Sequence, residues 1–470
     1  MRADAENSTR DAAPVPPPWA ERQVRVALEL PMASSERVYT TISTDTRAIM
    51  PGALFVALEG ERYDGHDHLV AAAAAGAAGA VVRVGTAAVG GLTLLQVPDT
   101  LRALGRLARA RRRTLTGPVI AITGTNGKTS TKEMLAAVLR TRHATHATRA
   151  NLNNLIGVPL TILEAPEGTE ALVVEAGANL PGEVARYRGI IEPDITIVTN
   201  AVAGHLEGFG SREAVIEEKL ALADGVALAI VGTDPAALPA RARERAKRVR
   251  TAALRDADLV PDHVTLEHDA RPRISIGGVS FTLAARGLHQ ADNAIRVWAV
   301  VEALQLERSA SARALEQFTI PGGRGELVSH GGLSVLNDCY NANPQSFRSV
   351  IATATAIRGD RRLVFVAGTM RELGPESAAL HRKIAEALVA LEPAILAAVG
   401  EFVHALEPWR AQLGDRLITA ADPLALGPLL RARLAGNELV VLKASRGVAL
   451  ERILPALTAP APISPANTSS

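Results

Sequence analysis

Short apolar runs alternate with polar turns along most of the chain. Several of these runs are apolar at consecutive positions, which is typical of parallel strands that are buried on both faces. Residues 262–284 differ, because they predict two or three antiparallel strands that turn at Gly277 and Gly278. Helical segments between the other runs predict an α/β protein with parallel sheets. The predicted parallel strands lie at residues 119–122, 172–175, 195–200, 333–336, 363–368, 394–399 and 439–442.

The strand at residues 119–122 leads into the segment Thr123-Gly124-Thr125-Asn126-Gly127-Lys128-Thr129-Ser130. Its glycines allow a tight turn whose N–H groups point inward, and a helix begins directly after it, which together attract phosphate. Lys128 can bind the terminal phosphates of a nucleotide, and Thr129 can offer a hydroxyl to Mg²⁺. The usual phosphate-loop pattern has its first glycine at the position of Ile122. A glycine turn without a ligand is the alternative, which Gly-Lys-Thr after a strand disfavours.

Length and composition limit the class of protein. At 470 residues the chain is expected to contain about three domains. Its 51 basic and 49 acidic residues nearly cancel, so no large basic surface for nucleic acid is required. The single cysteine, Cys339, excludes an internal disulfide and suits a reducing compartment. No apolar run reaches the length of a membrane span, and the N-terminus lacks a secretion-signal pattern, so we expect a soluble cytoplasmic protein.

We expect domain boundaries near residues 98 and 324. A small N-terminal α/β domain would cover residues 1–98, a central parallel-sheet domain residues 99–324, and a doubly wound C-terminal domain residues 325–470. Residues 98–113 predict a helix whose arginines form a solvated basic face. Residues 1–18 and 458–470 are rich in proline and in small or polar residues, and we expect both to be disordered.

Polar clusters follow several of the predicted strands. In the N-terminal domain the clusters Thr44-Asp45-Thr46-Arg47 and Asp64-Gly65-His66 could bind a diphosphate or a sugar, although turn and capping roles are the simpler alternative. In the central domain, Glu175 and His205 each follow a strand, where ligands bind in open parallel sheets. By themselves they could equally be capping residues. Lys219 lies in an acidic helix expected at residues 211–223, where a surface position is the default.

Taken together, these clusters resemble the Mur ligase family of peptidoglycan synthesis over residues 43 to about 451. Gly-Thr-Asn-Gly-Lys-Thr at residues 124–129 is the family's own form of the phosphate loop, which accounts for Ile122. Two stretches are most similar to the family member that joins D-alanyl-D-alanine to UDP-N-acetylmuramoyl-tripeptide. These are residues 338–346 and residues 368–374, the latter with His381 beyond it. An Asp-Asn-Pro-Arg sequence, typical of the sibling that adds diaminopimelate, does not occur.

The resemblance implies amide formation driven by ATP. The terminal carboxylate of the tripeptide would attack the γ-phosphate, and the amine of D-alanyl-D-alanine would then displace phosphate from the acyl phosphate. Lys128 would hold phosphate oxygens, and cations would offset the charge of the approaching carboxylate. The resemblance implies that Thr129 and Glu175 hold one Mg²⁺ and that His205 binds a second. It further implies that Lys219 is carbamoylated and then serves as an anionic ligand to the metal.

The resemblance also assigns the binding residues. The loop Gly124, Thr125, Asn126, Gly127, Lys128, Thr129 and Ser130 would bind ATP, with His289 and Asn293 near the adenine, Arg324 toward the phosphates and Asp338 toward the ribose. Gln290 replaces the usual Asn, and Ala444 replaces a Gly. The two N-terminal clusters would bind the UDP group. The remaining substrate residues would be Asn153, Asn154, Tyr340, Asn341, Asn343, Lys443, Ser445 and Arg446.

Other functions stay open on the sequence. Another Mur ligase or a folylpolyglutamate synthetase would use the same chemistry on a different amine or acid. A nucleotide-binding regulator without catalysis belongs to a different class, which the retained Lys128, Glu175, His205 and Lys219 disfavour. A phosphate-loop kinase would form a stable phosphorylated product and no amide. We expect a monomer with no nucleic-acid partner.

Overall fold

The computed structural model describes residues 15–61, 63–202, 204, 206–330 and 332–458. His205 lies outside the described residues, as do residues 1–14 and 459–470 of the segments predicted to be disordered. The chain divides into two compact units. The first consists of the residues up to Ile122 together with Arg142–Ala178 and Glu183–Thr196. The second consists of Thr123–Thr141, Asn179–Gly182 and the chain from Ile197 onward.

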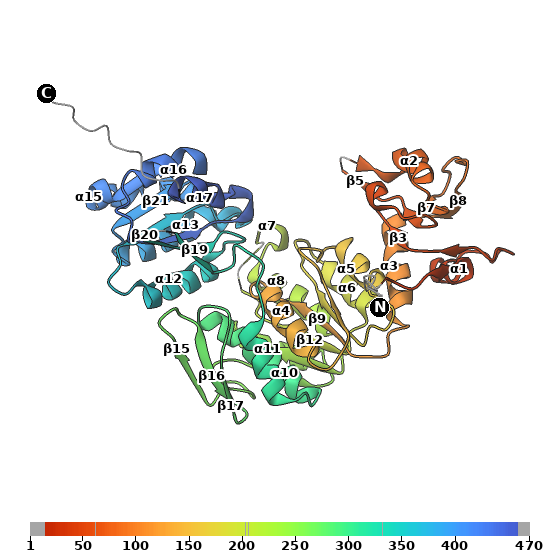
Figure 1. Ribbon diagram of the computed structural model, residues 1–470, viewed down its shortest axis with the longest axis horizontal. Helices are drawn as coiled ribbons and strands as arrows, with labels where there is room; N and C mark the ends of the chain where they lie inside the picture. Colours follow the sequence, from red (N-terminus) through yellow and green to blue (C-terminus); the bar gives the residue numbers. More distant parts are fainter. Residues whose placement is uncertain (1–14, 62, 203, 205, 331, 459–470) are drawn as a thin grey trace, which may run out of the picture. The chain divides into compact units, whose positions relative to one another are not determined.

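The N-terminal part of the first unit is a small parallel sheet with helices around it (Figure 1). Its strand order is β3 (Ile42–Ser43), β4 (Leu54–Val56), β7 (Gly79–Arg83) and β8 (Thr93–Val97), with parallel pairing throughout. Helix α1 (Glu21–Leu28) precedes the sheet, and α2 (Leu69–Ala74) packs on it through Leu69 and Ala72. β8 was not predicted, because its apolar positions are interrupted by Thr93 and Gln96.

Helix α3 (Thr100–Arg112) carries the predicted basic face, and that prediction is partly wrong. Arg111 and Arg112 are only 8% and 9% exposed. Arg112 donates to the backbone oxygens of Ile191 and Glu192 and pairs with Asp194 at 2.9 Å. Buried cations persist only where such partners are present. The helix is therefore fixed to the end of α6 (Glu183–Ile191) by its arginines as well as by its apolar face.

The central sheet has the order β10 (Thr145–Ala147), β11 (Ala171–Glu175), β9 (Val119–Thr123), β12 (Ile195–Val198), β13 (Leu228–Val231) and β14 (Val249–Thr251). Every residue of β9, β11 and β12 is buried, as their continuous apolar sequences predict. The main helices of this region are α4 (Lys128–Leu139), α5 (Gly157–Leu163), α6, α8 (Arg212–Leu220) and α9 (Leu238–Arg243).

An antiparallel sheet and two helices follow the central sheet. β15 (His263–Leu266), β16 (Pro272–Ile276) and β17 (Val279–Thr282) confirm the predicted antiparallel strands, and the turn lies at Gly277 and Gly278. Helices α10 (Leu288–Ala303) and α11 (Arg308–Gln317) come next. Trp298 of α10 is fully buried and stacks on Phe281 with ring centres 5.7 Å apart. The aromatic contact joins the small sheet to α10.

The C-terminal part is a doubly wound sheet, as predicted. Its strand order is β18 (Glu326–His330), β19 (Leu333–Asp338), β23 (Leu439–Lys443), β20 (Leu363–Ala367), β21 (Ile395–Val399) and β22 (Leu417–Ala420). Only the edge strand β18 pairs antiparallel. Along β20, Phe365 packs on the side of α12 (Pro344–Arg358) and α13 (Ser377–Ala390), whereas Val364 and Val366 pack on the side of α16 (Pro423–Arg431). Figure 1 shows α12 and α16 on opposite faces of this sheet.

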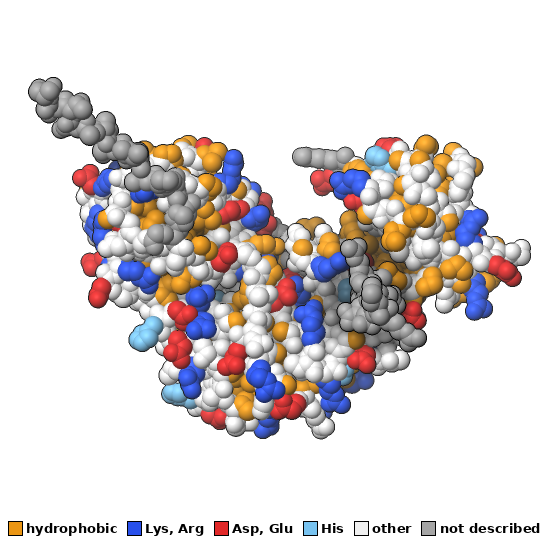
Figure 2. Space-filling model, in the orientation of Figure 1, with side chains coloured by type: hydrophobic (Ala, Val, Ile, Leu, Met, Phe, Trp, Pro, Cys, Tyr) orange, Lys and Arg blue, Asp and Glu red, His pale blue; other side chains and the backbone are white. Residues whose placement is uncertain are grey.

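No helix within the described residues is long and apolar enough to cross a membrane. Acidic and basic side chains are interspersed over the face of the molecule shown in Figure 2, in keeping with the balanced composition.

His381 of α13 fixes the loop that follows β20. Its Nε2 accepts a hydrogen bond from the backbone N–H of Met370 at 2.9 Å, and its Nδ1 donates to Ser377 O at 2.8 Å. This pattern requires the neutral imidazole, in which one nitrogen accepts and the other donates. The ring is 1% exposed and packs edge-on against Phe402. Burial lowers the pKa of His381 below the ordinary value for histidine.

Acidification is therefore expected to destabilise the C-terminal domain through His381. Below about pH 6.5 an unfolded histidine binds a proton, whereas folded His381 resists protonation, so stability is lost as the pH falls from there through its lowered pKa. We expect the thermal midpoint of the wild type to fall further between about pH 7.5 and about pH 5.5 than that of His381→Gln. The exposed His404 gives a matched control, because His404→Gln should behave as the wild type. Equal falls in the wild type and His381→Gln would contradict this role.

Candidate functional site

The phosphate-loop segment folds as a tight turn between β9 and α4. Gly124 and Gly127 have φ angles of 138° and 82°, which favour glycine. A β-carbon at Gly127 would lie 2.5 Å from Asn293 Oδ1, and one at Gly124 would overlap the hydroxyl of Thr199. Gly127 is the N-cap of α4, so the loop leads directly into a helix N-terminus. Both glycines are therefore required by close neighbours as well as by backbone conformation.

Side chains after β12 hold the backbone of this loop. Asn126 N donates to Asn200 Oδ1 at 3.0 Å, and Thr199 Oγ1 donates to Asn126 O at 2.6 Å. The ammonium of Lys128 donates to the backbone oxygens of Gly124 and Thr125 at 2.9 and 3.2 Å. The cation thus folds back on the loop that carries it. Thr129 and Ser130 are buried at the start of α4.

A polar pocket of about 150 Å³ lies beside the loop, entirely within the second unit. It brings together four stretches that are far apart in the sequence: the phosphate loop, the start of α10, and the ends of β19 and β23 in the C-terminal domain. The predicted residues that line it are Asn126, Gly127, Ser130, His289, Gln290, Asn293, Arg324, Asp338, Tyr340, Asn341 and Lys443. Several lining residues were not predicted as site residues, namely Asn200, Asp292, Arg296, Gln345, Ser346 and Ser349.

Asp338 and Lys443 face each other at the carboxyl ends of adjacent parallel strands. Lys443 Nζ donates to Asp338 Oδ2 and to Asn341 O, each at 2.6 Å, and the Lys443 side chain is only 2% exposed. Two of its three N–H donors are therefore used within the domain, where they fix the loop after β19. Nearby, the Arg324 guanidinium carbon lies 3.6 Å from the ring centre of Tyr340, a cation–π contact at the edge of the pocket.

Gln290 connects α10 to the phosphate-loop helix. Its Nε2 donates to Ser130 Oγ at 3.3 Å, and its Oε1 accepts from Asn293 Nδ2 at 3.2 Å. Asn293 Oδ1 in turn accepts from Arg296, which also pairs with Asp292 at 2.9 Å. The glutamine that replaces the expected asparagine thus has a defined structural place, because it bridges the phosphate-loop helix and Asn293.

The first unit contains a second group of predicted residues. Asn153 Nδ2 donates to Glu175 Oε1 at 2.8 Å, and Glu175 is 2% exposed at the end of β11. A β-carbon at Gly177 would lie 3.0 Å from the Asn153 side chain. Asn154 behaves differently, because its Oδ1 accepts from the backbone N–H groups of Ile156 and Gly157. Its side-chain oxygen stabilises the turn into α5.

The N-terminal clusters lie at the carboxyl edge of the small parallel sheet. Asp45 accepts from Arg47 through both oxygens, and this contact lowers the pKa of Asp45 to about 2. His66 Nδ1 donates to Asp64 at 2.6 Å, while His66 Nε2 accepts from the backbone N–H of Arg83 at 2.9 Å. Both ring nitrogens of His66 are therefore used, Nδ1 within its own loop and Nε2 to hold that loop to the end of β7. Thr44, Thr46 and Gly65 lie in the same two loops.

The predicted metal residues are only partly described. Thr129 and Lys219 are 4% and 1% exposed, and Lys219 Nζ lies 5.1 Å from the ring centre of Phe209. His205 lies outside the described residues. Among the residues that are described, no group of three or more His, Cys, Asp or Glu side chains is arranged to hold a metal ion. The structure thus leaves the metal assignments as predictions.

The other predicted substrate residues lie around the C-terminal loops. Ser445 Oγ accepts from Arg371 N at 2.9 Å and connects the loops after β20 and β23. Arg446 is exposed and pairs with Glu451 at 2.5 Å. Asn343 is 4% exposed, caps α12 and donates to Asn126 Oδ1 at 2.6 Å. Asn343 is therefore in contact with the phosphate loop, whereas Ser445 and Arg446 make contacts within their own domain.

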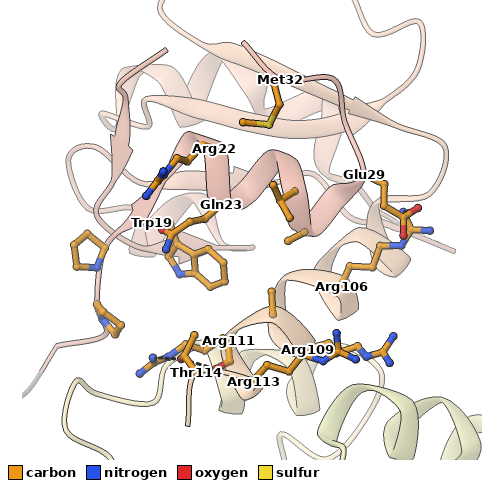
Figure 3. A pocket seen from close by; sticks show the side chains of 15 residues that line it. Trp19, Arg22, Gln23, Glu29, Met32, Arg106, Arg109, Arg111, Arg113 and Thr114 are labelled. Atoms are coloured by element: carbon orange, nitrogen blue, oxygen red, sulfur yellow. Dashed lines mark hydrogen bonds and ion pairs between the residues drawn. The ribbon is translucent and has the colours of Figure 1, made fainter. Parts of the chain in front are cut away.

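A larger cavity of about 960 Å³ lies between α1 and α3 and contains none of the predicted site residues (Figure 3). Its walls are mostly apolar, with Trp19, Val26 and Met32 among them. Arg109 and Arg113 in its wall are both paired with Glu192, at 2.7 and 2.8 Å. Because none of its lining residues is a predicted catalytic or nucleotide-binding residue, we place the chemistry in the smaller polar pocket.

The residues missed by the sequence are those that act through distant contacts. Gln345 was within a recognised stretch, but nothing in its spacing indicated that its side chain contacts the phosphate loop at 2.7 Å. Asp234, which accepts a hydrogen bond from Gln345, follows β13, and its position after a parallel strand is the one signal that the sequence offers for it.

Comparison with known families matches all three parts of the chain. Residues 38–112 match the Mur ligase family, catalytic domain; residues 122–301 match the Mur ligase middle domain; and residues 323–446 match the Mur ligase, glutamate ligase domain.

Individual relatives are similar over nearly their whole length. The UDP-N-acetylmuramoyl-tripeptide–D-alanyl-D-alanine ligase of Bacillus subtilis is 32% identical, over 88% of this chain and 92% of its own. The enzyme of the same name from Escherichia coli is 34% identical, over 88% of this chain and 93% of its own. A crystal structure of MurF from Acinetobacter baumannii is 28% identical and superposes with a TM-score of 0.85, over 95% of this chain and 100% of that chain. With three matching family models and relatives of this identity and coverage, the chain belongs to the Mur ligase family.

Proposed function

We propose that the protein is an ATP-dependent ligase that joins D-alanyl-D-alanine to UDP-N-acetylmuramoyl-tripeptide during peptidoglycan precursor synthesis. The observation that carries this proposal is the shared pocket, in which the phosphate loop meets Asn293, Asp338 and Lys443 from the two domains of the second unit. The near-full-length similarity to ligases of that name supports the choice of substrates.

In the proposed reaction, a carboxylate oxygen of the tripeptide bonds to the γ-phosphorus of ATP while the bond to the β-phosphate oxygen breaks. The products of this step are ADP and an acyl phosphate. The amine of D-alanyl-D-alanine then attacks the acyl carbon, phosphate leaves with that carboxylate oxygen, and the amine gives up a proton. The protein's task is to bring two anions together and to hold them in line.

The phosphate loop, residues 124–130, is proposed to bind the ATP phosphates, with Lys128 leaving its backbone acceptors to contact the terminal ones. Asn293 and His289 would lie toward the adenine, Arg324 toward the phosphates and Asp338 toward the ribose. The lining of the pocket supports this arrangement. Lys443 would keep Asp338 in place through the 2.6 Å ion pair that the two residues form.

Mg²⁺ is proposed as the accompanying metal, because a hydroxyl and a carboxylate are the oxygen donors it prefers. Thr129 and Glu175 would hold one ion, and His205 would hold a second. The bound ions would offset the negative charge of the ATP phosphates. Lys219 is proposed to be carbamoylated. Its burial supports this, because an anionic carbamate at an enclosed position attracts a metal ion more strongly than one in open solvent.

The remaining substrate contacts are proposed from the loops that carry them. Thr44, Asp45, Thr46, Arg47, Asp64, Gly65 and His66 are proposed to form the UDP-binding edge, with the Asp64–His66 contact shaping its loop. Asn153 would face the tripeptide, and Asn154 would support the same loop. The incoming dipeptide would be surrounded by Tyr340, Asn341, Asn343, Ser445 and Arg446.

Three further properties remain predictions: domain boundaries at residues 98 and 324, a monomeric state and a cytoplasmic location.

Release of ADP from ATP is expected to require both proposed substrates. With UDP-N-acetylmuramoyl-tripeptide present, adding D-alanyl-D-alanine should start steady ADP release, because the amine removes the acyl phosphate and frees the site. A coupled assay with and without the dipeptide measures this, with single L-amino acids as comparison amines and folate as a comparison acid. ADP release that is independent of the dipeptide, or faster with a comparison amine or acid, would favour another ligase of the family or a kinase.

Replacement of Lys219 tests the carbamate. Lys219→Ala is expected to be inactive and to recover part of its activity in a small carboxylate such as acetate, because the added anion can occupy the place of the carbamate. Lys247 is exposed, so Lys247→Ala serves as a matched control with wild-type rates and no response to acetate. Full activity of Lys219→Ala without acetate would eliminate the proposed role.

A further inference from the structure

The side chain of Asn126 joins the phosphate loop to the C-terminal domain. Asn126 Nδ2 donates to Gln345 Oε1 at 2.7 Å, and Asn343 Nδ2 donates to Asn126 Oδ1 at 2.6 Å. Asn343 caps α12, and a capping box with Ser346 fixes the first turn of this 15-residue helix. Both partners of the Asn126 amide therefore come from a rigid helix start.

Gln345 makes a second contact with the central domain. Its Nε2 donates to Asp234 Oδ2 at 2.5 Å, in the turn after β13. The backbone oxygen of Asp234 accepts from Ala201 N at 3.0 Å, which connects that turn to the segment after β12. Because the amide oxygen of Gln345 accepts while its nitrogen donates, the orientation of the amide is fixed by its two partners.

The same asparagine is held through its backbone. Asn126 N–H donates to Asn200 Oδ1, and Asn126 O accepts from Thr199 Oγ1, so the peptide groups on both sides of its α-carbon are fixed. A shift of the Asn126 side chain therefore acts directly on the loop between Gly124 and Gly127. Gln345 is half-buried beside the pocket, and its side chain provides the connection from the C-terminal domain to this loop.

We propose that Gln345 is a positioning residue that sets the C-terminal domain on the phosphate loop, with Asn126 and Asp234 as its two partners. This inference rests on the proposed ligase function. The pocket contains groups from both domains, so a nucleotide and an acyl acceptor are brought into line only when these domains are in register. Gln345 acts through Asn126 and does not need to touch a reacting atom.

A donor–acceptor exchange tests the proposal. Gln345→Ala removes both hydrogen bonds and is expected to lower kcat about tenfold, with the KM for ATP within about threefold, because the loop backbone keeps its other partners. Gln345→Glu keeps the acceptor for Asn126 but sets a second carboxylate against Asp234, so kcat should fall at least as far. Adding Asp234→Asn to Gln345→Glu restores a donor opposite the new carboxylate. This double variant is expected to recover kcat to within about threefold of the wild type.

Gln412 is exposed in the same domain, and Gln412→Ala should keep wild-type kcat. Wild-type kcat in Gln345→Ala would overturn the proposal, as would a double variant as slow as Gln345→Glu. Rescue by the double variant would support it, because a general loss of folding is not repaired by exchanging one donor for one acceptor. Absence of turnover in the wild type and in Gln412→Ala alike would instead overturn the proposed ligase function, and this inference with it.

Discussion

The conformation of the phosphate loop depends on side chains that reach it from other segments. Thr199 and Asn200 hold the backbone of Asn126, and Asn293 lies so close to Gly127 that a β-carbon there would be 2.5 Å away. Close packing around Gly127 and hydrogen bonds to Asn126 restrict the loop to one geometry. The backbone of the turn is thus held in place without a ligand, and such preorganisation is the condition for strong electrostatic stabilisation.

Side-chain contacts between distant segments also explain how the C-terminal domain contributes to the pocket. Asp338 and Lys443 form a buried ion pair at the ends of neighbouring strands, and Asn343 and Gln345 follow on the same connection. A lysine that is bonded to Asp338 and to Asn341 O shapes the loop that reaches the phosphate loop. The resemblance assigned Lys443 to the substrate directly, whereas its contacts support a role in positioning Asp338.

Much of the fold could be predicted from the sequence because the buried strands are continuous apolar runs. β9, β11, β20 and β23 are buried at every position and were all predicted, whereas β8 and β22 are partly exposed and were missed. The burial of Arg112 could not be predicted, because its partners are backbone oxygens about eighty residues away. The contacts of Gln290 and Gln345 could not be predicted for the same reason. Glutamine is common in helices, and only the folded chain brings these two side chains to Ser130 and Asn126.

In the proposed reaction, the γ-phosphate is transferred to a carboxylate before the amide forms. UDP-N-acetylmuramoyl-tripeptide labelled with ¹⁸O in its terminal carboxylate can be turned over with ATP and D-alanyl-D-alanine, and the released phosphate analysed by mass spectrometry. We expect one labelled oxygen in each phosphate released, because the acyl carbon loses a carboxylate oxygen to phosphorus. Unlabelled phosphate, formed together with the amide product, would contradict it.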